Sequence, residues 1–295
     1  MSEFERHRPV MVREALEFLK VEPDGTYIDA TVGAGGHSEQ ILKVLAQGSG
    51  RLLGIDRDPN ALRIAHERLA GFGERVKLVE GNFAEIDALH AQSFLPPGAG
   101  TLADLGLSSM QLEEAERGFS FSRPGPLDMR MGEGDVTAEE IVNETPEQEL
   151  ADLIFKFGEE RHSRRIARAI VKARPIRLTT QLAQVVTRSI PSRAGLHQIH
   201  PATRTFMALR LAVNRELENL QSFLDKVLAV LAPGARVVVI SFHSLEDRIV
   251  KESFRSWKRN GQALILTKHV VRPAAEEMRE NPRSRSAKLR AAERL

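Results

Sequence analysis

The chain of 295 residues contains no cysteine. This absence excludes disulfide frameworks, cysteine-ligated zinc, iron–sulfur clusters and every mechanism with a cysteine nucleophile. No apolar run approaches the roughly 18 to 20 residues that cross a membrane, and the polar segment from Met1 to Val10 lacks the apolar core of a signal peptide. The sequence therefore predicts a cytoplasmic protein, long enough for roughly two folding units.

One stretch of the chain lacks acidic residues altogether. Residues 161–215 contain 12 lysines and arginines and no Asp or Glu, whereas residues 85–160 contain 17 acidic and four basic residues. Residues 248–295 add 13 basic and five acidic residues. The formal net charge of +2 is therefore the sum of large opposed blocks. Such an asymmetry is typical of a protein that binds a polyanion.

Short apolar runs alternate with helical patterns in the first third of the chain. This alternation is typical of βαβ units and a mainly parallel sheet. The strand pattern returns near the C-terminus, after a turn at Pro233-Gly234. The predicted strands are Tyr27–Ala30, Arg51–Asp56, Val76–Val79, Thr101–Leu105 and Arg236–Ile240, with a last strand or hairpin within Ala263–Val271.

The middle of the chain has helical periodicity instead. Thr137-x-x-Glu140 and Thr145-Pro-Glu-Gln148 have the spacing of capping boxes, and the second would place a proline at the first helical position. We therefore predict an α/β fold in which a Rossmann-like sheet, formed by residues 1–109 and 214–295, is interrupted by a helical insertion at residues 110–213.

A glycine-rich turn, Asp29-Ala-Thr-Val-Gly-Ala-Gly-Gly-His37, lies between a predicted strand and a predicted helix. Glycines there allow a tight turn and a close approach of a ligand to the backbone. Ser38 replaces the third glycine of the dinucleotide-binding motif. An acid just before the turn instead suits S-adenosylmethionine, which has an ammonium group and no pyrophosphate. Taken alone, such a loop is also typical of a plain tight turn.

Further candidate residues follow the other predicted strands. Asp56 lies 21 residues after Gly35, where an acid accepts hydrogen bonds from a ribose diol, and a helix N-cap is the alternative. Phe83 suits either an adenine ring or the core. Asp104 and His243 follow the fourth and fifth strands, at the edge where open α/β sheets bind ligands. His243 is a base, a nucleic-acid contact or a histidine held by backbone hydrogen bonds.

Five cations of the acid-free stretch recur at helical intervals and so share one helix face. Because no acid within the stretch neutralises them, we predict that they bind RNA phosphates. These residues are Arg161, Arg164, Arg165, Arg168 and Lys172. Four cations near the C-terminus either add phosphate contacts or form a mobile basic end, namely Arg283, Arg285, Lys288 and Arg290.

On these features the chain resembles, from end to end, the bacterial RsmH (MraW) family of 16S rRNA cytosine-N4 methyltransferases. The matching segments are His7–Met11, Asp29–Ser38, Gly54–Pro59, Asp104–Leu112, Arg117–Phe121, Pro126–Met131, Phe157–Arg161, His200–Phe206, Ser241–Arg248 and Asn281–Arg285. The resemblance implies a methyltransferase sheet with an inserted helical domain that recognises 16S rRNA, within the small ribosomal subunit. It also implies S-adenosylmethionine contacts at Gly35, Gly36, His37, Asp56, Phe83, Asp104 and Gln111.

The absence of cysteine also restricts the reaction. Methylation of carbon 5 of cytosine normally needs a Cys thiolate, so a nitrogen or oxygen acceptor remains, and N4 of a cytidine in the decoding region fits the resemblance. The Asp/Asn-Pro-Pro-aromatic motif of many amino-methyltransferases is replaced by Asp104-Leu-Gly-Leu-Ser-Ser109. We therefore expect Asp104 to orient the amine without a metal, and the target base to leave any helix that it occupies.

Two other functions fit part of the sequence. An NAD(P)-dependent oxidoreductase would also use a glycine loop and Asp56, although the third glycine of its motif is missing. A non-catalytic RNA-binding assembly protein would use the basic block but would not require the loop and Asp56 in register. A hydrolase triad of Ser241, His243 and Asp247 is disfavoured, because three residues so close in one segment do not build the usual geometry.

Overall fold

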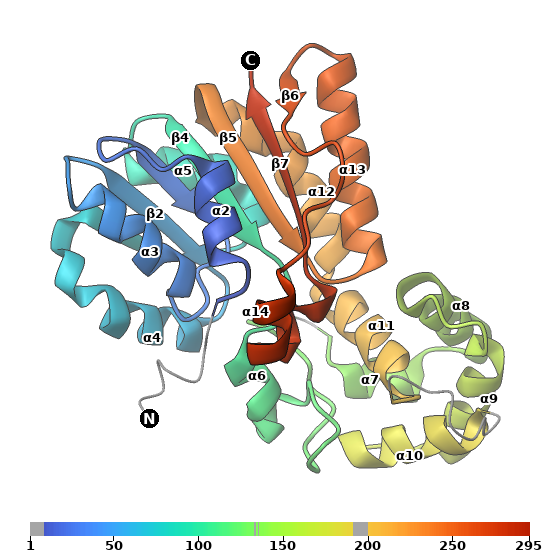
Figure 1. Cartoon of the computed structure of the whole chain (residues 1–295). Coiled ribbons are helices and arrows are strands. Elements are labelled where there is room, and N and C mark those ends of the chain that lie inside the picture. The colour runs from blue at the N-terminus through green and yellow to red at the C-terminus, as the bar shows by residue number, and fades with distance from the viewer. Residues whose placement is uncertain (1–8, 133, 135, 191–199) are drawn as a thin grey trace. The chain divides into compact units, whose positions relative to one another are not determined.

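The computed structural model describes residues 9–295, except for 133, 135 and 191–199. The chain divides into two compact units, a first one that ends at Ser108 and resumes at Leu217, and a second one from Ser109 to Glu216. The predicted boundaries of the insertion, 110 and 213, lie within three residues of this division. The two units are visible in Figure 1, and each is described by itself.

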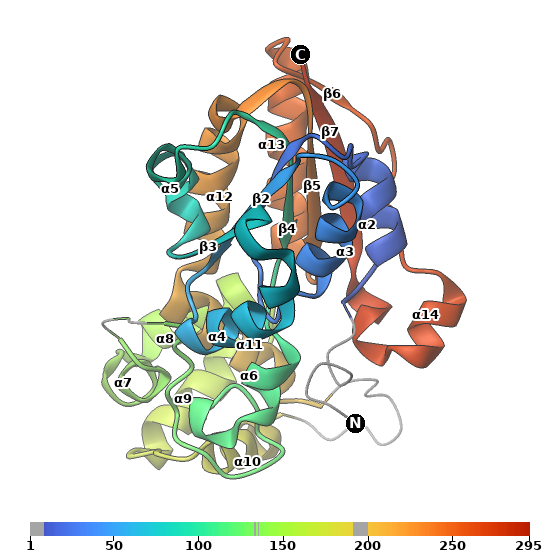
Figure 2. The same cartoon turned by 90° about the vertical axis from the view of Figure 1, so that its left-hand side faces the viewer.

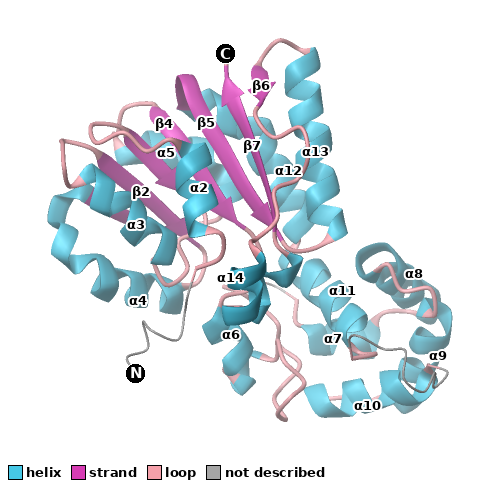
Figure 3. Ribbon diagram, in the orientation of Figure 1, coloured by secondary structure: helices cyan, strands magenta, loops and turns pink. Residues whose placement is uncertain are grey.

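A seven-stranded sheet in the order β3-β2-β1-β4-β5-β7-β6 forms the centre of the first unit (Figure 3). Strands β1 to β5 pair in parallel, and β7 runs antiparallel to both of its neighbours. The strands are β1 Thr26–Asp29, β2 Arg51–Asp56, β3 Val76–Glu80, β4 Gly98–Asp104, β5 Leu231–Ser241, β6 Ala263–Ile265 and β7 Lys288–Arg294. The predicted α/β fold with a mainly parallel sheet is confirmed.

Helices cover both faces of this sheet, which explains why β2, β4 and β5 are buried over most of their length. Leu19 and Ile41 lie in the core on one face, and Phe223 and Phe254 lie in the core on the other. Figure 2 shows α2 and α3 on the first side and α5 and α12 on the second. The helices of this unit are α2 Val12–Leu19, α3 Gly36–Leu45, α4 Pro59–Leu69, α5 Ile86–Ser93, α12 Glu216–Lys226, α13 Ser244–Arg259 and α14 Ala275–Glu280, with 3-10 turns at Ala70–Arg75, Phe83–Glu85, Val227–Val230 and Pro282–Ser286.

The strand order reverses between β1 and β4. Strands β2 and β3 follow β1 toward one edge of the sheet, whereas β4 and β5 lie on the other side of β1. In open α/β sheets, ligands bind in the crevice at the carboxyl ends of the strands where the order reverses. Strand β1 ends at Asp29 and β4 ends at Asp104. The topology therefore brings the glycine turn and Asp104 to the same edge of the sheet.

The second unit is helical. Helix α8 packs against α9 and α11, and Ile154, Ile166 and Leu209 are buried among them. Its helices are α6 Ser109–Glu113, α7 Ala138–Glu144, α8 Glu147–Gly158, α9 Ser163–Ala173, α10 Thr179–Ser189 and α11 Thr203–Asn214, with a 3-10 turn at Ala115–Arg117. Over the described part of the chain, no helix has both the length and the apolar character needed to cross a membrane.

One of the two predicted capping boxes is confirmed and the other is wrong. Thr137 is the N-cap of α7: its Oγ1 accepts a hydrogen bond from the Glu140 N–H, and its own N–H donates to the Glu140 carboxylate. Thr145 instead ends α7, since its N–H donates to the Ile141 carbonyl, and Pro146 is the N-cap of α8. A proline forces the preceding residue into extended backbone, which separates the two helices at Thr145.

The C-terminal segment is a strand, so of the two alternatives for its cations the mobile basic end is wrong for residues 288–294, and the phosphate contacts stay a prediction. Strand β7 lies between β5 and β6, and its Leu289 is fully buried. The Arg290 guanidinium donates to the Asp247 carboxylate at 2.7 Å. The strand predicted within Ala263–Val271 is confirmed as β6, whereas the hairpin alternative is wrong, because both β6 and Val271 pair with β7.

Candidate functional site

The turn after β1 requires glycine at two positions. Gly33 and Gly35 have φ values of +52° and +78°, in the left-handed region that side chains with a Cβ rarely adopt. The Gly35 N–H donates to the Val32 carbonyl at 2.9 Å, and α3 begins at the next residue. The predicted turn therefore exists, and its backbone conformation explains its glycines.

The buried Asp29 carboxyl stabilises this turn through hydrogen bonds. Its Oδ2 accepts a hydrogen bond from Ser38 Oγ at 2.6 Å, and its Oδ1 accepts one from the Thr31 N–H at 3.2 Å. Burial raises the pKa of the Asp29 carboxyl to about 6, although the Ser38 and Thr31 donors oppose the shift. Both carboxyl oxygens are thus engaged within the loop, so Asp29 holds the turn in shape.

Asp56 joins the end of β2 to the same turn. Its Oδ2 accepts a hydrogen bond from the Gly33 N–H at 2.7 Å, and its Oδ1 accepts one from the Asp58 N–H at 2.9 Å. The helix-cap alternative is wrong, because Asp58 is the N-cap of α4 and accepts a hydrogen bond from Asn60. Each Asp56 oxygen has a second lone pair, so the predicted role toward a ribose diol stays a prediction.

Asp104, at the end of β4, carries a buried oxygen with no partner. Its backbone N–H donates to Thr31 Oγ1 at 2.7 Å, while its Oδ1 has no hydrogen bond within the described part of the chain. Burial, followed by the negative charges of Asp29 and Glu246, raises the pKa of the Asp104 carboxyl well above its usual value. Such an oxygen is costly to bury alone, and a cationic or amine donor from a ligand would offset that cost.

His37 connects Asp104 to the N-terminal segment. Its Nε2 lies 2.9 Å from the Val10 carbonyl oxygen, and its Nδ1 lies 3.5 Å from Asp104 Oδ2. Because a carbonyl only accepts hydrogen bonds, Nε2 carries a hydrogen, and Nδ1 carries one only when the ring is cationic. A cationic ring would therefore place an Nδ1 hydrogen toward Asp104 Oδ2. The structure thus brings together two of the predicted cofactor contacts.

The other predicted cofactor contacts are distributed over both units. Gly36 is the first residue of α3 and lies close to the Pro9 ring. A Cβ at position 36 would come within 3.0 Å of this ring, so a larger residue would be crowded there. Phe83 is half-buried, and its ring meets that of Phe223 edge-on at a centroid distance of 5.4 Å, so part of it belongs to the core. Gln111 is buried in α6 of the second unit, and its contact with a cofactor stays a prediction.

The environment of His243 favours the structural interpretation among the three alternatives. His243 begins α13, and its Nδ1 accepts a hydrogen bond from the Glu246 N–H at 3.4 Å. Its Nε2 lies 3.2 Å from Glu246 Oε1, while Glu246 Oε2 accepts a hydrogen bond from the Phe242 N–H. Both ring nitrogens face the same residue, and the buried Nε2 has no hydrogen-bond partner among the described residues. The predicted RNA contact of His243 stays a prediction.

Helix α9 presents a basic face. Arg164, Arg165 and Lys172 are exposed, as is Arg161 in the turn before the helix, whereas Ile166 on the opposite side is buried. The fifth predicted cation, Arg168, is also exposed, but its Nε lies 3.4 Å from Glu147 Oε1 of α8. The expectation that no acid neutralises this face is therefore wrong for Arg168, since the acid comes from outside the counted stretch. Such an exposed pair is weak.

Other cations of the acid-free stretch have structural tasks. Arg174 donates to the backbone carbonyls of Val142 and Thr145, and Arg210 forms a short ion pair of 2.8 Å with Glu216. These cations stabilise the helical unit and are not free to bind phosphate. The block of positive charge therefore contains an inner set that holds the fold and an exposed set that includes the cations of α9.

Three residues that the sequence did not single out as site residues complete the geometry, namely Thr31, Ser38 and Glu246. The signal for the first was present, because an Asp that bonds the N–H two residues later forms an Asx-turn, as Asp29 does with Thr31. Across the described residues, no group of three or more His, Asp or Glu side chains is arranged to hold a metal ion.

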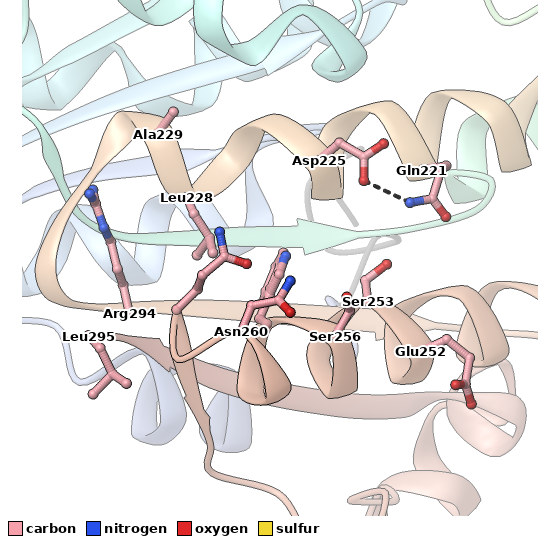
Figure 4. A pocket seen from close by; sticks show the side chains of 12 residues that line it. Gln221, Asp225, Leu228, Ala229, Glu252, Ser253, Ser256, Asn260, Arg294 and Leu295 are labelled. Carbon is pink, nitrogen blue, oxygen red and sulfur yellow. Dashed lines mark hydrogen bonds between the residues drawn. The ribbon is translucent and has the colours of Figure 1, made fainter.

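A separate cavity of about 680 Å³ lies between α12 and α13 (Figure 4). Its walls include Leu228 and Trp257, and the Gln221 amide donates to Asp225 at 2.9 Å across one side. No residue that the sequence predicted for the site lines this cavity. The candidate site therefore remains at the carboxyl ends of β1, β2 and β4.

Comparison with known proteins identifies relatives over the whole chain. The MraW methylase family matches residues 4–295. "Ribosomal RNA small subunit methyltransferase H" of Koribacter versatilis is 52% identical over 98% of this chain and 94% of its own. The protein of the same name from Acidobacterium capsulatum is 49% identical over 99% of both chains. Among solved structures, a SAM-dependent O-methyltransferase from Thermotoga maritima has 10% identity and a TM-score of 0.47 over 99% of this chain and 68% of its own.

Proposed function

The chain belongs to the MraW methylase family, and from this premise we propose that it transfers a methyl group from S-adenosylmethionine to the exocyclic N4 of a cytidine in 16S rRNA. The reaction class follows from the family. The acceptor nucleotide, its position in the decoding region and the context of the small ribosomal subunit are parts of the proposal, as is a cytoplasmic location.

The observation that carries the proposal is the unpartnered Asp104 Oδ1 at the reversal point of the sheet. The residues around it fit S-adenosylmethionine, which supplies a methyl group on a sulfonium when bound. When this ligand is bound, the turn from Gly33 to Gly36 would offer backbone to it, Asp56 would accept hydrogen bonds from the ribose hydroxyls, and Phe83 would lie against the adenine. Asp104 then accepts hydrogen bonds from the ligand's ammonium group and from the cytidine amine, which satisfies its buried oxygen.

Asp104 also explains how an amine is methylated without a metal. A fixed carboxyl oxygen orients the N4 amine and stabilises the positive charge that develops on this nitrogen during transfer. Asp104 Oδ2 lies 3.5 Å from His37 Nδ1, so a cationic His37 ring would offset the charge of an ionised Asp104. The missing cysteine excludes the usual route to carbon 5. The exocyclic amine is therefore the acceptor that these residues suit best.

The helical unit supplies the RNA-binding surface in this proposal. The relatives are named for the small-subunit ribosomal RNA. The exposed cations of α9 form a face whose attraction to phosphates does not depend on base sequence. Choice of the target nucleotide then depends on contacts to an unpaired base, because enzymes that act on a base take it out of its stack.

Transfer of radiolabelled methyl groups tests the proposal directly. The purified protein is incubated with labelled S-adenosylmethionine and either naked 16S rRNA or small ribosomal subunits, and 23S rRNA serves as the control acceptor. We expect label in one of the two 16S substrates and none in 23S rRNA. Binding of 16S rRNA without any transfer would favour the assembly protein, and binding of NADP instead of S-adenosylmethionine would favour the oxidoreductase.

A further inference from the structure

A stack of three aromatic rings runs from the core of the helical unit to its surface. The Phe121 ring lies 4.6 Å from the His200 ring, tilted by 33°, and 4.8 Å from the Phe206 ring, which meets it edge-on at 68°. Phe206 is 5% exposed, Phe121 is half-buried and His200 is exposed. The innermost ring thus supports the middle one, and the outermost ring presents itself to solvent.

The outer ring is held in place although it is exposed. The Ala202 N–H donates to His200 Nδ1 at 3.2 Å, and the Thr203 N–H donates to the His200 carbonyl at 3.0 Å. The Nδ1 atom therefore acts as an acceptor, and in the neutral ring Nε2 carries the hydrogen. An exposed side chain normally samples several rotamers, and a ligand that fixes it must offset the lost conformational entropy. Here the hydrogen bond from Ala202 already restricts the His200 ring, so less entropy is lost on binding.

The loop that carries the middle ring is fixed as well. Thr179 Oγ1 donates to the Arg123 carbonyl at 3.1 Å, and the Gly125 N–H donates to Thr179 Oγ1 at 3.2 Å. Thr179 is fully buried at the start of α10. The loop is thus held to α10 at Arg123 and Gly125, just after Phe121, and the Phe121 ring is also held by its contact with Phe206.

Charge near this surface favours one class of ligand. Two arginines close in sequence to this pair are exposed, Arg123 two residues after Phe121 and Arg204 four residues after His200, although Arg204 lies 3.8 Å from Glu160. Unpaired RNA bases stack on aromatic and histidine rings, and cations nearby attract the backbone. The proposed function assigns no role to Phe121 or His200. Both lie in segments that carry the family resemblance, Arg117–Phe121 and His200–Phe206.

We propose that His200, supported by Phe121, is a stacking platform for an unpaired nucleobase of the RNA substrate. This inference rests on the proposed function, because it assumes that RNA is the substrate. Stacking accepts every base, since each has a π-face. The platform therefore holds a nucleotide in the unpaired conformation and contributes affinity, while the choice of cytidine is made at Asp104.

Substitutions at His200 separate stacking from a contact through charge. His200→Ala removes the ring, His200→Trp retains a larger ring, and His200→Lys retains a cation without a ring. The matched control is Phe155→Ala, which removes an aromatic ring that is 62% exposed on α8 of the same unit. Affinity is measured by fluorescence anisotropy with a single-stranded oligoribonucleotide that contains 2-aminopurine, whose emission is quenched by stacking.

We expect His200→Ala and His200→Lys to weaken binding of this RNA about tenfold, because stacking is worth roughly 1 to 3 kcal/mol per base. His200→Trp retains wild-type affinity and quenching, and Phe155→Ala changes neither. All four variants keep their affinity for S-adenosylmethionine, which verifies the fold. Wild-type affinity in His200→Ala, full rescue by Lys but not by Trp, or an equal loss in Phe155→Ala would overturn the platform.

Failure of this inference and failure of the proposed function give different results. If the wild-type protein methylates 16S rRNA while the His200 variants bind and react as it does, only the platform is wrong. If the wild-type protein transfers no methyl group to either 16S substrate, the proposed function is wrong, and the platform loses the premise on which it rests.

Discussion

The two units of this chain use charge in opposite ways. In the first unit, carboxyl groups are gathered at the ends of β1, β2 and β4, and burial raises the pKa values of Asp29, Asp56 and Asp104. In the second unit, the cations of α9 are exposed to solvent. A buried acid interacts strongly with one donor at one place, whereas an exposed cationic face attracts any nearby polyanion and is screened by salt.

This difference teaches that the two kinds of binding are separable. A change among the buried carboxyl groups should act on the small ligand and depend on pH, because protonation decides whether these groups attract a cation. A change on α9 should act on RNA and depend on ionic strength, because each phosphate contact releases counterions. The net charge of +2 conceals this division, since it adds the two sets together.

The largest expected effect is that of Asp104→Asn. The amide retains the shape of the side chain but loses its charge, so the rate of methyl transfer should fall about 100-fold, as for the loss of one electrostatic contact in an active site. S-adenosylmethionine affinity should fall as well. Single-turnover transfer and calorimetric titration of the cofactor measure the two effects.

The control for this change is Asp152→Asn, on the exposed side of α8. It should leave both quantities unchanged. The free Asp104→Asn protein should also unfold at no lower temperature than wild type, because the substitution removes a buried charge that lacks a full set of partners. A normal single-turnover rate with normal cofactor affinity would contradict the role assigned to Asp104.

The next largest effect is expected from the combined reversal Arg164→Glu, Arg165→Glu and Arg168→Glu. RNA affinity should fall at least about tenfold, and the slope of log K against log salt should become shallower by about 2 to 3, since three phosphate contacts are lost. Filter binding over a range of salt concentrations measures both. Cofactor affinity should stay the same, and an equal loss of both affinities would show instead that the fold is damaged.

A smaller effect, on stability, is expected from Ser38→Ala. This change removes the hydroxyl that donates to Asp29 Oδ2 and should lower the free energy of unfolding by about 1 to 3 kcal/mol. The pKa of Asp29 is about 6 when folded, above its unfolded value, so ionisation of Asp29 destabilises the fold as pH rises from about 4 to 6. Without the Ser38 hydroxyl, the ionised Asp29 carboxylate loses one of its hydrogen-bond donors and becomes less stable.

The cost of Ser38→Ala should therefore be larger at pH 8 than at pH 5. Urea unfolding at both pH values measures it, with Ser49→Ala, which loses an exposed bond to Asp24, as the control. The same cost at both pH values would mean that Ser38 does not stabilise the ionised Asp29.

The smallest expected effect is that of Glu147→Gln. It frees Arg168 from its ion pair on the basic face, so RNA affinity should rise by about twofold or less, and the free energy of unfolding should change by less than about 1 kcal/mol. Filter binding at low salt measures the gain. A loss of RNA affinity would show that the Arg168–Glu147 pair positions the arginine for RNA instead of competing with it.

The sequence was sufficient to predict the parallel sheet and the glycine turn, because their signals are local. Apolar runs, strand-ending acids and glycines at left-handed positions are each written in a few consecutive residues. Strand β7 was missed for the opposite reason. Its segment, Lys288–Arg294, has small alanines among charges, and its partners in β5 and β6 lie outside the segment.

The sequence was sufficient to name candidate residues for the site, but not to show how the acids among them differ in their hydrogen bonds. Asp29 and Asp104 both end strands, and only the hydrogen bonds from Ser38 and Thr31 show that Asp29 is occupied while Asp104 Oδ1 is not. The pairing of Arg168 with Glu147 likewise depends on how α8 packs against α9. Such partners come from tertiary packing, which no count of charges along a segment contains.

Analysis of the methylated nucleoside tests the central claim most directly. Small ribosomal subunits that lack the modification are incubated with the protein and labelled S-adenosylmethionine, and the digested RNA is examined by mass spectrometry with fragmentation of each methylated nucleoside. The account predicts N4-methylcytidine from a single position of 16S rRNA, lost in the Asp104→Asn variant. A methyl group on carbon 5 of cytosine, or transfer that is unaffected by Asp104→Asn, would contradict it.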